Sequence, residues 1–213
     1  PLKVVITNWP TGADGEPVVE EVELINNPEN ADDGVRTAPF SGTLYIERDD
    51  FKADPPPKYY RLTPGREVRL RGGYFVTATG FESDADGNVT EVHVTYDADT
   101  KGGNAPDGRK VKSTMHWVSA AHAVDADVAT YERLFSAEIP GAETGDVFDD
   151  LDPNSMTVLR GCKLEPELAN TAPGDVVQFE RLGYFAADPS APLLFHRTVG
   201  LRDEWANIQK RKK

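Results

Sequence analysis

Cysteine is nearly absent from this chain, and long apolar runs are absent altogether. Cys162 is the single cysteine among 213 residues, so no internal disulfide framework can form and a reducing compartment is expected. No stretch approaches the roughly 18 consecutive apolar residues that cross a bilayer, so no membrane span is expected. The chain starts with Pro1 and shows no signal-like apolar stretch. We therefore expect a cytoplasmic piece of a longer polypeptide.

Motifs that carry chemistry are missing as well. Gly72-Gly73 and Gly102-Gly103 do not form a phosphate-binding glycine pattern. Ser119 and His122 lack the motif that surrounds a catalytic serine, and a structural role is predicted for both His116 and His122. The histidines are scattered and one cysteine cannot build a thiolate site, so no metal site is predicted. The four histidines are His93, His116, His122 and His196. The sequence thus predicts no catalytic residue and no cofactor site.

The apolar residues recur mostly at every second position, which is typical of β-strands rather than helices. Residues 67–71 alternate strictly, with charged side chains on one face and Val68 and Leu70 on the other. The turn sequence at 84–88 predicts a hairpin. Short strands separated by Gly, Pro and Asp clusters are typical of barrels or sandwiches. An all-β fold with few short helices is predicted.

The expected elements follow from this pattern. Strands are predicted over 2–7, 18–24, 43–46, 67–71, 73–79, 81–83, 89–96, 111–118, 157–159, 175–179, 183–187 and 193–199. Turns or short helices are predicted at 50–51, 125–134 and 166–169, with Asp125 as a helix cap. Polar loops are predicted at 26–38 and 138–154.

The charge of the chain is unevenly distributed. A net charge of −13 argues at first against nucleic acid, because phosphate contacts need Lys and Arg. Residues 58–73 nevertheless carry a net charge of +4, which leaves −17 on the rest of the chain. A basic strip on an acidic body forms a local anion site with repulsive surroundings. The alternative interpretation is a solvated strand face.

The basic strip also contains aromatic side chains. Single-stranded nucleic acid is bound by positive charge along its backbone and by stacking on its bases. Gln178 and Arg181, three residues apart, add an amide and a guanidinium that can address base edges or phosphates. The stacking and charged residues of the strip are Tyr59, Tyr60, Arg61, Arg69 and Arg71. These residues alone leave a nucleic-acid-binding barrel and a protein-interaction barrel equally open.

Six segments carry a resemblance to a known family. They are GREVRLR (65–71), YDADTKGG (96–103), DGRKVKSTMHWVSAAHAV (107–124), YERLFS (131–136), QFERLGYF (178–185) and HRTVGLRDEWA (196–206). In this order they closely resemble the C-terminal region of bacterial glutaminyl-tRNA synthetases, over nearly the whole chain. Glutamyl-tRNA synthetases of the eukaryotic and archaeal type share this region. Its barrel is also similar to that of a ribosomal protein that binds 5S RNA.

The resemblance implies two β-barrels that bind the anticodon loop of tRNA(Gln). The proximal barrel would comprise 1–45 plus 125–206, the distal barrel 46–124, and a basic tail 207–213. The family ligates glutamine to tRNA with ATP and magnesium, which are held in a separate upstream catalytic domain. This segment is therefore expected to have no cofactor, and a monomer is expected. The alternatives are the same region of a glutamyl-tRNA synthetase, a free-standing RNA-binding barrel or a protein-docking module.

Site residues are implied by the same resemblance. Arg69 and Arg71 correspond to contacts with the first anticodon base and its phosphate, and Arg61 to the arginine at the third base. Gln178 and Arg181 correspond to the pair that reads the central uridine. The chain departs from the family near the third base, with Lys58 where some relatives carry Gln and Tyr60 where several carry Lys. Recognition of that base is therefore expected to be rearranged. A further family arginine precedes this segment, so the central-base site is expected to be incomplete within it.

Overall fold

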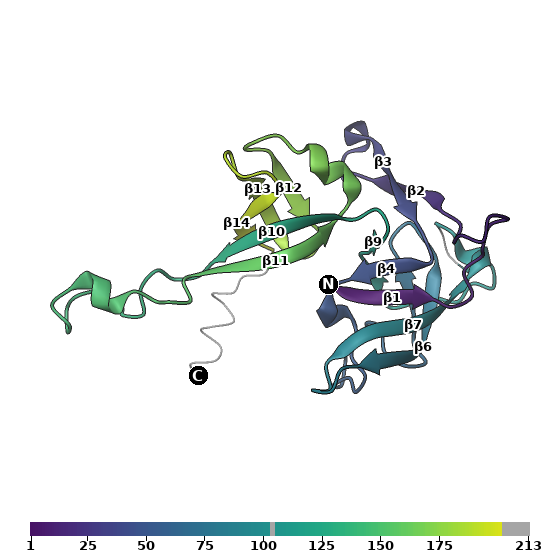
Figure 1. Ribbon diagram of the computed structural model, residues 1–213, viewed down its shortest axis with the longest axis horizontal. Coiled ribbons are helices and arrows are strands. Elements are labelled where there is room, and N and C mark those ends of the chain that lie inside the picture. Colours follow the sequence, from purple (N-terminus) through teal and green to yellow (C-terminus); the bar gives the residue numbers. More distant parts are fainter. Residues whose placement is uncertain (103–104, 202–213) are drawn as a thin grey trace. The chain divides into compact units, whose positions relative to one another are not determined.

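The computed structural model describes residues 1–102 and 105–201, which form strands joined by turns and short 3-10 helices (Figure 1). The predicted all-β class is confirmed. The chain divides into two compact units, one of residues Pro1–Val124 and one that begins at Asp125. Within the described part, no helix is long and apolar enough to cross a lipid bilayer. The predicted basic tail 207–213 and the last residues of the segment HRTVGLRDEWA lie outside the described residues.

The sheet of the first unit is curled into a barrel-like form. Its strand order is β8-β5-β6-β7-β1-β4-β9. The strands are β1 Leu2–Ile6, β4 Thr43–Ile46, β5 Glu67–Leu70, β6 Phe75–Ser83, β7 Val89–Asp97, β8 Thr114–Met115 and β9 Val118–Ser119. The edge strands β8 and β9 are separated in sequence only by His116 and Trp117. The sheet therefore has to curl until its two edges approach one another.

A hairpin of β2 (Glu20–Ile25) and β3 (Val35–Phe40) adds to the same unit. Val22 and Leu24 of β2 and Ala38 and Phe40 of β3 are buried. The predicted loop at 26–38 is therefore wrong from Val35 onward. The polar residues of β3 obscure the strand pattern in the sequence. Its pairing with β2 and the burial of alternate residues determine its conformation.

Aromatic rings fill the core of the first unit. The Phe40 ring lies 4.6 Å from Trp117, 5.0 Å from Trp9 and 5.4 Å from Tyr74, measured between centroids. The rings are tilted or edge-to-face, the arrangements that the charge distribution of aromatic rings favours. Trp117 also donates its indole N–H to the carbonyl oxygen of Arg71 at 2.8 Å. The core thus holds the backbone of a predicted site residue.

The second unit is built on a five-stranded sheet in the order β11-β10-β14-β13-β12. The strands are β10 Val124–Tyr131, β11 Met156–Leu164, β12 Val176–Phe179, β13 Gly183–Ala187 and β14 Leu194–Gly200. Its core includes Phe185 and Phe195, and the partly buried Phe179 packs on them with ring centroids 4.4 and 5.5 Å away. The connection between β10 and β11 extends away from this sheet (Figure 1).

The predicted short helix at 125–134 is wrong, because the segment is strand β10 through Tyr131. Asp125 does not cap a helix but forms an ion pair with Lys163. Asp127 accepts a hydrogen bond from the backbone N–H of Gly161 at 3.1 Å. The segment pairs in parallel with β14 and contacts Lys163 and Gly161 of β11. These tertiary contacts outweigh its weak helical signal.

The other short elements agree better with the sequence. The turn predicted at 50–51 overlaps a 3-10 helix that ends at Asp50, and the turn predicted at 166–169 lies within another 3-10 helix. The strand predicted at 111–118 is divided into β8 and β9, whereas 73–79 and 81–83 join into the single strand β6. The 3-10 helices are η1 Ala31–Asp33, η2 Arg48–Asp50, η3 Ala98–Thr100, η4 Val147–Asp150 and η5 Pro166–Asn170.

The pairing of β1 places the start of the chain in the seven-stranded sheet. Strand β1 pairs in parallel with β7 and antiparallel with β4, so the start of the chain shares a sheet with β5 to β9. Two-residue periodicity identifies strands, but it does not specify the partner of each strand.

Asp188 organises the loop that joins β13 to β14. Its carboxylate contacts Nε2 of His196 at 2.7 Å and accepts hydrogen bonds from the backbone N–H groups of Ser190 and Ala191 at 2.7 and 2.8 Å. The His196 hydrogen bond, together with those from Ser190 and Ala191, holds the pKa of Asp188 far below its usual value.

We predict that Asp188→Asn lowers the melting temperature at neutral pH. Because the pKa of Asp188 is depressed in the folded state, its stabilising effect is present above its unfolded-state pKa of about 3.9 and is lost as the pH falls below it. The difference in melting temperature between wild type and variant should therefore shrink in acid. Thermal unfolding followed by circular dichroism from about pH 7 to about pH 3 measures this, with the exposed Asp54→Asn as control. A difference that stays constant over this range would contradict the assignment.

Candidate nucleic-acid interface

Strand β5 carries the first of the predicted anticodon residues. It buries Val68 and Leu70 and leaves Glu67 and Arg69 partly exposed, which confirms the predicted alternation. The backbone N–H of Arg69 donates to the carbonyl oxygen of Ser113 at 3.0 Å. The Arg69 guanidinium lies 5.0 Å from the centre of the Phe75 ring, where its charge interacts favourably with the ring face. Backbone and side chain of Arg69 are thus both positioned by neighbouring elements.

Arg71 lies in the turn that follows β5, and its backbone is held on both sides. Its N–H donates to the carbonyl oxygen of Met115 at 2.9 Å, and its own carbonyl accepts from Trp117. The next residue, Gly72, has φ +64°, and a Cβ there would lie 2.5 Å from Cδ2 of Leu24. Only glycine combines this backbone conformation with such a close approach. The turn therefore presents Arg71 in one fixed backbone conformation.

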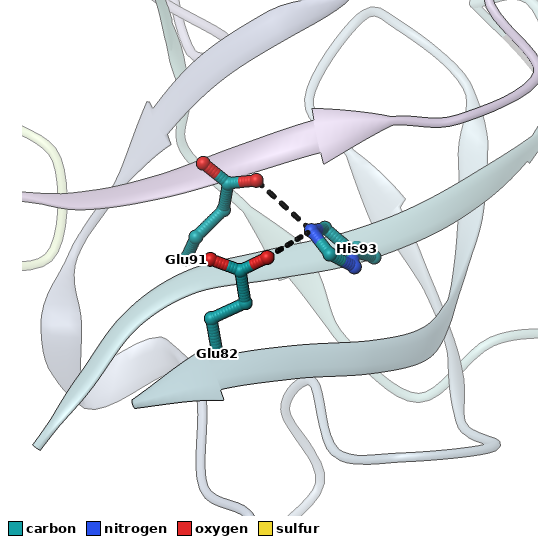
Figure 2. A group of neighbouring side chains, drawn as sticks. All are labelled: Glu82, Glu91 and His93. Atoms are coloured by element: carbon teal, nitrogen blue, oxygen red, sulfur yellow. Dashed lines mark hydrogen bonds and ion pairs between the residues drawn. The ribbon is translucent and has the colours of Figure 1, made fainter. Parts of the chain in front are cut away.

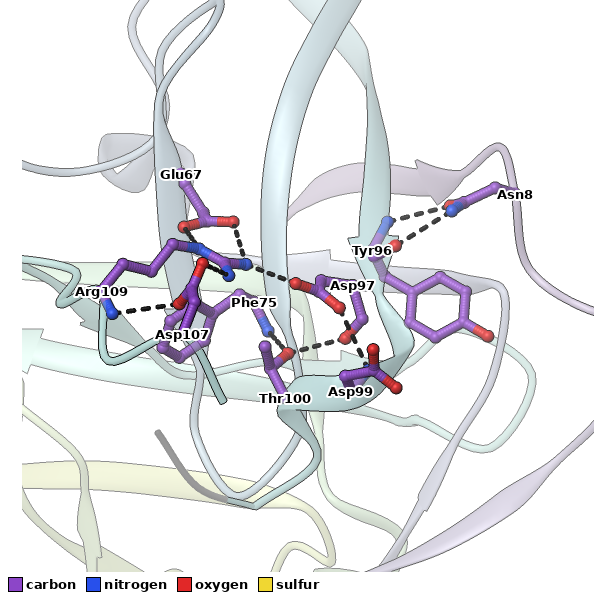
Figure 3. A network of polar contacts seen from close by, with 9 residues as sticks. All are labelled: Asn8, Glu67, Phe75, Tyr96, Asp97, Asp99, Thr100, Asp107 and Arg109. Carbon is purple, nitrogen blue, oxygen red and sulfur yellow. Dashed lines mark hydrogen bonds and ion pairs between the residues drawn. The ribbon is translucent and has the colours of Figure 1, made fainter. Parts of the chain in front are cut away.

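Arg109, which the sequence analysis did not select, links three carboxylates beside β5 (Figure 3). Its Nε and Nη2 donate to Glu67 at 2.9 and 3.0 Å, and its Nη1 donates to Asp107 at 2.8 Å. Its Nη2 also contacts Asp97 at the end of β7. The guanidinium lies 5.5 Å from the centre of the Phe75 ring. Arg109 therefore fastens its loop to both β5 and β7.

The charges of this network reinforce one another. Glu67, followed by Asp97 and Asp107, raises the pKa of Arg109 above its usual value, and Arg109 in turn lowers the pKa of Asp97. Glu67 is the one acidic side chain within residues 58–73. Arg109, which lies outside the strip, pairs with Glu67 in a bidentate manner.

Arg61 is placed against a buried carboxylate. Its Nη1 donates to Asp50, which is only 2% exposed. An unpaired charge at such a position would be costly, so this ion pair fixes the direction of the Arg61 guanidinium. The backbone carbonyl of Arg61 also accepts a hydrogen bond of 3.4 Å from Arg66.

Lys58 and Tyr60 lie on the surface close to Arg61 in sequence. Lys58 has φ +67°, a left-handed conformation that is uncommon outside glycine. Tyr60 is 48% exposed, and Nζ of Lys112 lies 5.0 Å from the centre of its ring. An exposed ring beside an ammonium group can stack on a base while the ammonium meets a phosphate.

Lys112 belongs to a second basic segment that the sequence analysis left out of the site. Arg109, Lys110 and Lys112 immediately precede β8, which pairs in parallel with β5. The signal available in the sequence was the run of three cations within four residues. Its connection to the first strip depends on strand pairing, which periodicity does not reveal.

In the second unit, Gln178 and Arg181 lie at the end of β12 and in the turn that follows. Gln178 is exposed and lies opposite Tyr184 of β13, which is 41% exposed. The amide and the aromatic ring therefore share one sheet face. Arg181 has φ +66°, a sparsely populated conformation that is enriched at functional sites.

The predicted residues are thus divided between the two units. Gln178 and Arg181 belong to the second unit. Those in the first unit are Lys58, Tyr60, Arg61, Arg69 and Arg71.

Two family models match the chain. Residues 1–97 and residues 114–188 each match a model described as tRNA synthetases class I (E and Q), anti-codon binding domain. The chain belongs to this anticodon-binding family. The family that the sequence analysis predicted is therefore confirmed. Residues 98–113, between the two matches, contain Arg109, Lys110 and Lys112.

Curated relatives of this anticodon-binding chain are glutamine–tRNA ligases. That of Nitrobacter winogradskyi is 50% identical over 98% of the chain and 36% of the relative. That of Rhodopirellula baltica is 50% identical over 100% of the chain and 35% of the relative. That of Pseudomonas putida is 50% identical over 97% of the chain and 36% of the relative. The chain therefore spans little more than a third of the length of these relatives.

We predict that Arg109→Met lowers the melting temperature of the chain. The substitution removes the group that links Glu67, Asp97 and Asp107 and leaves three carboxylates close together. Arg109→Lys keeps the charge but cannot form the bidentate pair, so an intermediate melting temperature is expected. Thermal denaturation measures this, with the neighbouring exposed Lys110→Met as control. Equal melting temperatures of Arg109→Met and Lys110→Met would contradict the structural role of Arg109.

Proposed function

We propose that the chain is the anticodon-binding part of a glutamine–tRNA ligase and that it binds the anticodon loop of tRNA(Gln). The observation that carries this proposal is the basic strip on β5, held in place by Arg109 and Trp117, in a chain of the class I (E and Q) anticodon-binding family. The relatives named above are glutamine enzymes, which favours glutamine over glutamate.

The chemistry of the described surface suits an RNA loop. Arg69, Arg71 and Lys112 supply cations for phosphates, and Tyr60 supplies an exposed ring for a base. Gln178 offers an amide that both donates to and accepts from a base edge. Acidic residues over the rest of the chain repel RNA elsewhere and so favour one docking mode.

Individual roles follow in the proposal. Arg69 and Arg71 contact the first anticodon base and its phosphate, and Gln178 and Arg181 read the central uridine. The third base lies near Arg61, Lys58 and Tyr60, with the Arg61 guanidinium oriented by Asp50.

The ligation reaction belongs, in this proposal, to the part of the parent protein outside this chain. That part binds ATP, magnesium and glutamine, and the parent charges tRNA(Gln). We propose that the parent acts as a monomer in the cytoplasm, where a lone cysteine stays reduced.

Gln178→Ala in the parent protein should weaken binding of tRNA with the native anticodon by about 1–3 kcal/mol, the usual contribution of a base-edge contact. For tRNA substituted at the central anticodon base, the variant and the wild type should bind equally. Val176→Ala, two residues earlier on the same strand face and 62% exposed, is the control. Binding titrations against both tRNAs measure the effect. No loss for the native anticodon, or an equal loss for every anticodon, would show that Gln178 does not read a base.

Arg71→Ala should instead weaken binding of every anticodon variant and reduce the slope of log K against log salt by about one unit, as expected for a phosphate contact. Lys3→Ala is the matched control, because Lys3 lies on β1 and is paired with Glu91. Titrations at several salt concentrations give the slope. A loss confined to one anticodon, with an unchanged slope, would identify Arg71 as a base reader instead.

A further inference from the structure

Three potential metal ligands converge on one face of the sheet in the first unit (Figure 2). Glu82 comes from β6, and Glu91 and His93 come from β7. One ligand atom from each residue lies within 4.8 Å of the other two. Nε2 of His93 is 2.9 Å from Oε1 of Glu91 and 3.8 Å from Oε1 of Glu82. Within residues 1–102 and 105–201, no other group of three such residues converges in this way.

Strand register, rather than loop conformation, brings these groups together. Glu82 lies directly opposite Glu91, and Gly80 lies opposite His93. Glu91 and His93 are two residues apart and therefore share a face of β7. Gly80 has no side chain, and a Cβ at that position would lie 3.9 Å from Nδ1 of His93. The space over Gly80 accommodates the imidazole ring beside the two carboxylates.

The cluster contains two carboxylates, whereas Lys3 is the one cation described in contact with it. Like charges directly opposite one another on adjacent strands destabilise the pair. Lys3 of β1 contacts Oε2 of Glu91 at 2.7 Å. The other oxygen of Glu91, Oε1, faces His93. Glu82 is exposed to solvent, so an ion can reach the cluster.

We propose that Glu82, Glu91 and His93 bind a divalent transition-metal ion of the zinc type, with water completing the coordination. Ligand atoms about 2.0–2.2 Å from a tetrahedral zinc ion lie roughly 3.3 Å from one another. The separations of 2.9 and 3.8 Å from Nε2 of His93 bracket that value. An imidazole nitrogen among the donors suits zinc, cobalt or nickel, whereas magnesium and calcium prefer oxygen ligands alone.

Along β6, this site is distant from the part of the proposed anticodon surface around Arg69 and Phe75. Glu82 lies seven residues beyond Phe75 on β6, which is about 23 Å of strand at the usual rise. Metal binding can therefore be tested without tRNA, and its outcome does not depend on the proposed function.

The test is calorimetric titration of the metal-free 213-residue chain with Zn²⁺, and separately with Mg²⁺. One Zn²⁺ per chain should bind, and Mg²⁺ should not. Glu82→Gln and His93→Ala should each weaken Zn²⁺ binding by at least about tenfold. Glu29→Gln, an exposed carboxylate in the loop after β2, is the control and should bind as the wild type does. Circular dichroism confirms that each variant is folded.

NMR of the imidazole groups identifies the ligand directly. Zn²⁺ should shift the signals of His93 and leave those of His116, His122 and His196 in place. Absence of zinc binding, undiminished binding in both Glu82→Gln and His93→Ala, or shifts confined to another histidine would each overturn the proposal.

Discussion

The two-residue link between the edge strands β8 and β9 constrains the whole first unit. Seven flat strands would span about 28 Å from edge to edge, since neighbouring strands lie 4.7–4.9 Å apart. The step from Met115 to Val118 covers at most about 11 Å of chain. The sheet must therefore roll up, which places β8 beside β5. Trp117, within the link, is buried against Phe40 and reaches the carbonyl of Arg71.

This closure also holds the backbone of the basic strip in place. The backbone of Arg69 and Arg71 is bonded to Ser113 and Met115, which closure brings alongside β5. Arg109, in the same returning segment, pairs with Glu67. Side chains that are held before binding lose less conformational freedom when a ligand arrives. A site built in this way can contribute affinity although the chain as a whole is acidic.

The sequence was sufficient for the strand class, most strand positions, the alternation within β5 and the family. It was insufficient wherever strand pairing determines the conformation of a segment or brings distant side chains together. Strand β10 was predicted as a helix because Asp125 resembles a cap, whereas its partner β14 determines its conformation. Arg109 was overlooked because its three carboxylates come from three places in the sequence. The Glu82, Glu91 and His93 cluster was overlooked for the same reason, since only the register of β6 and β7 brings Glu82 beside the other two. The roles in anticodon binding stay predictions for all the selected residues: Lys58, Tyr60, Arg61, Arg69, Arg71, Gln178 and Arg181.

The pairing of β1 with β7 has a consequence for synthesis of the chain. Lys3 lies opposite Glu91, 88 residues later in the sequence. At about 5–20 residues per second, the ribosome needs roughly 4 to 18 s to make the intervening segment. During this interval the apolar strand Leu2–Ile6 can pair with β4 but not with β7. Contacts so distant in sequence also slow folding, because a long loop must close before they form. The first unit therefore completes its sheet late, and one side of β1 is open to association with other nascent chains until β7 emerges.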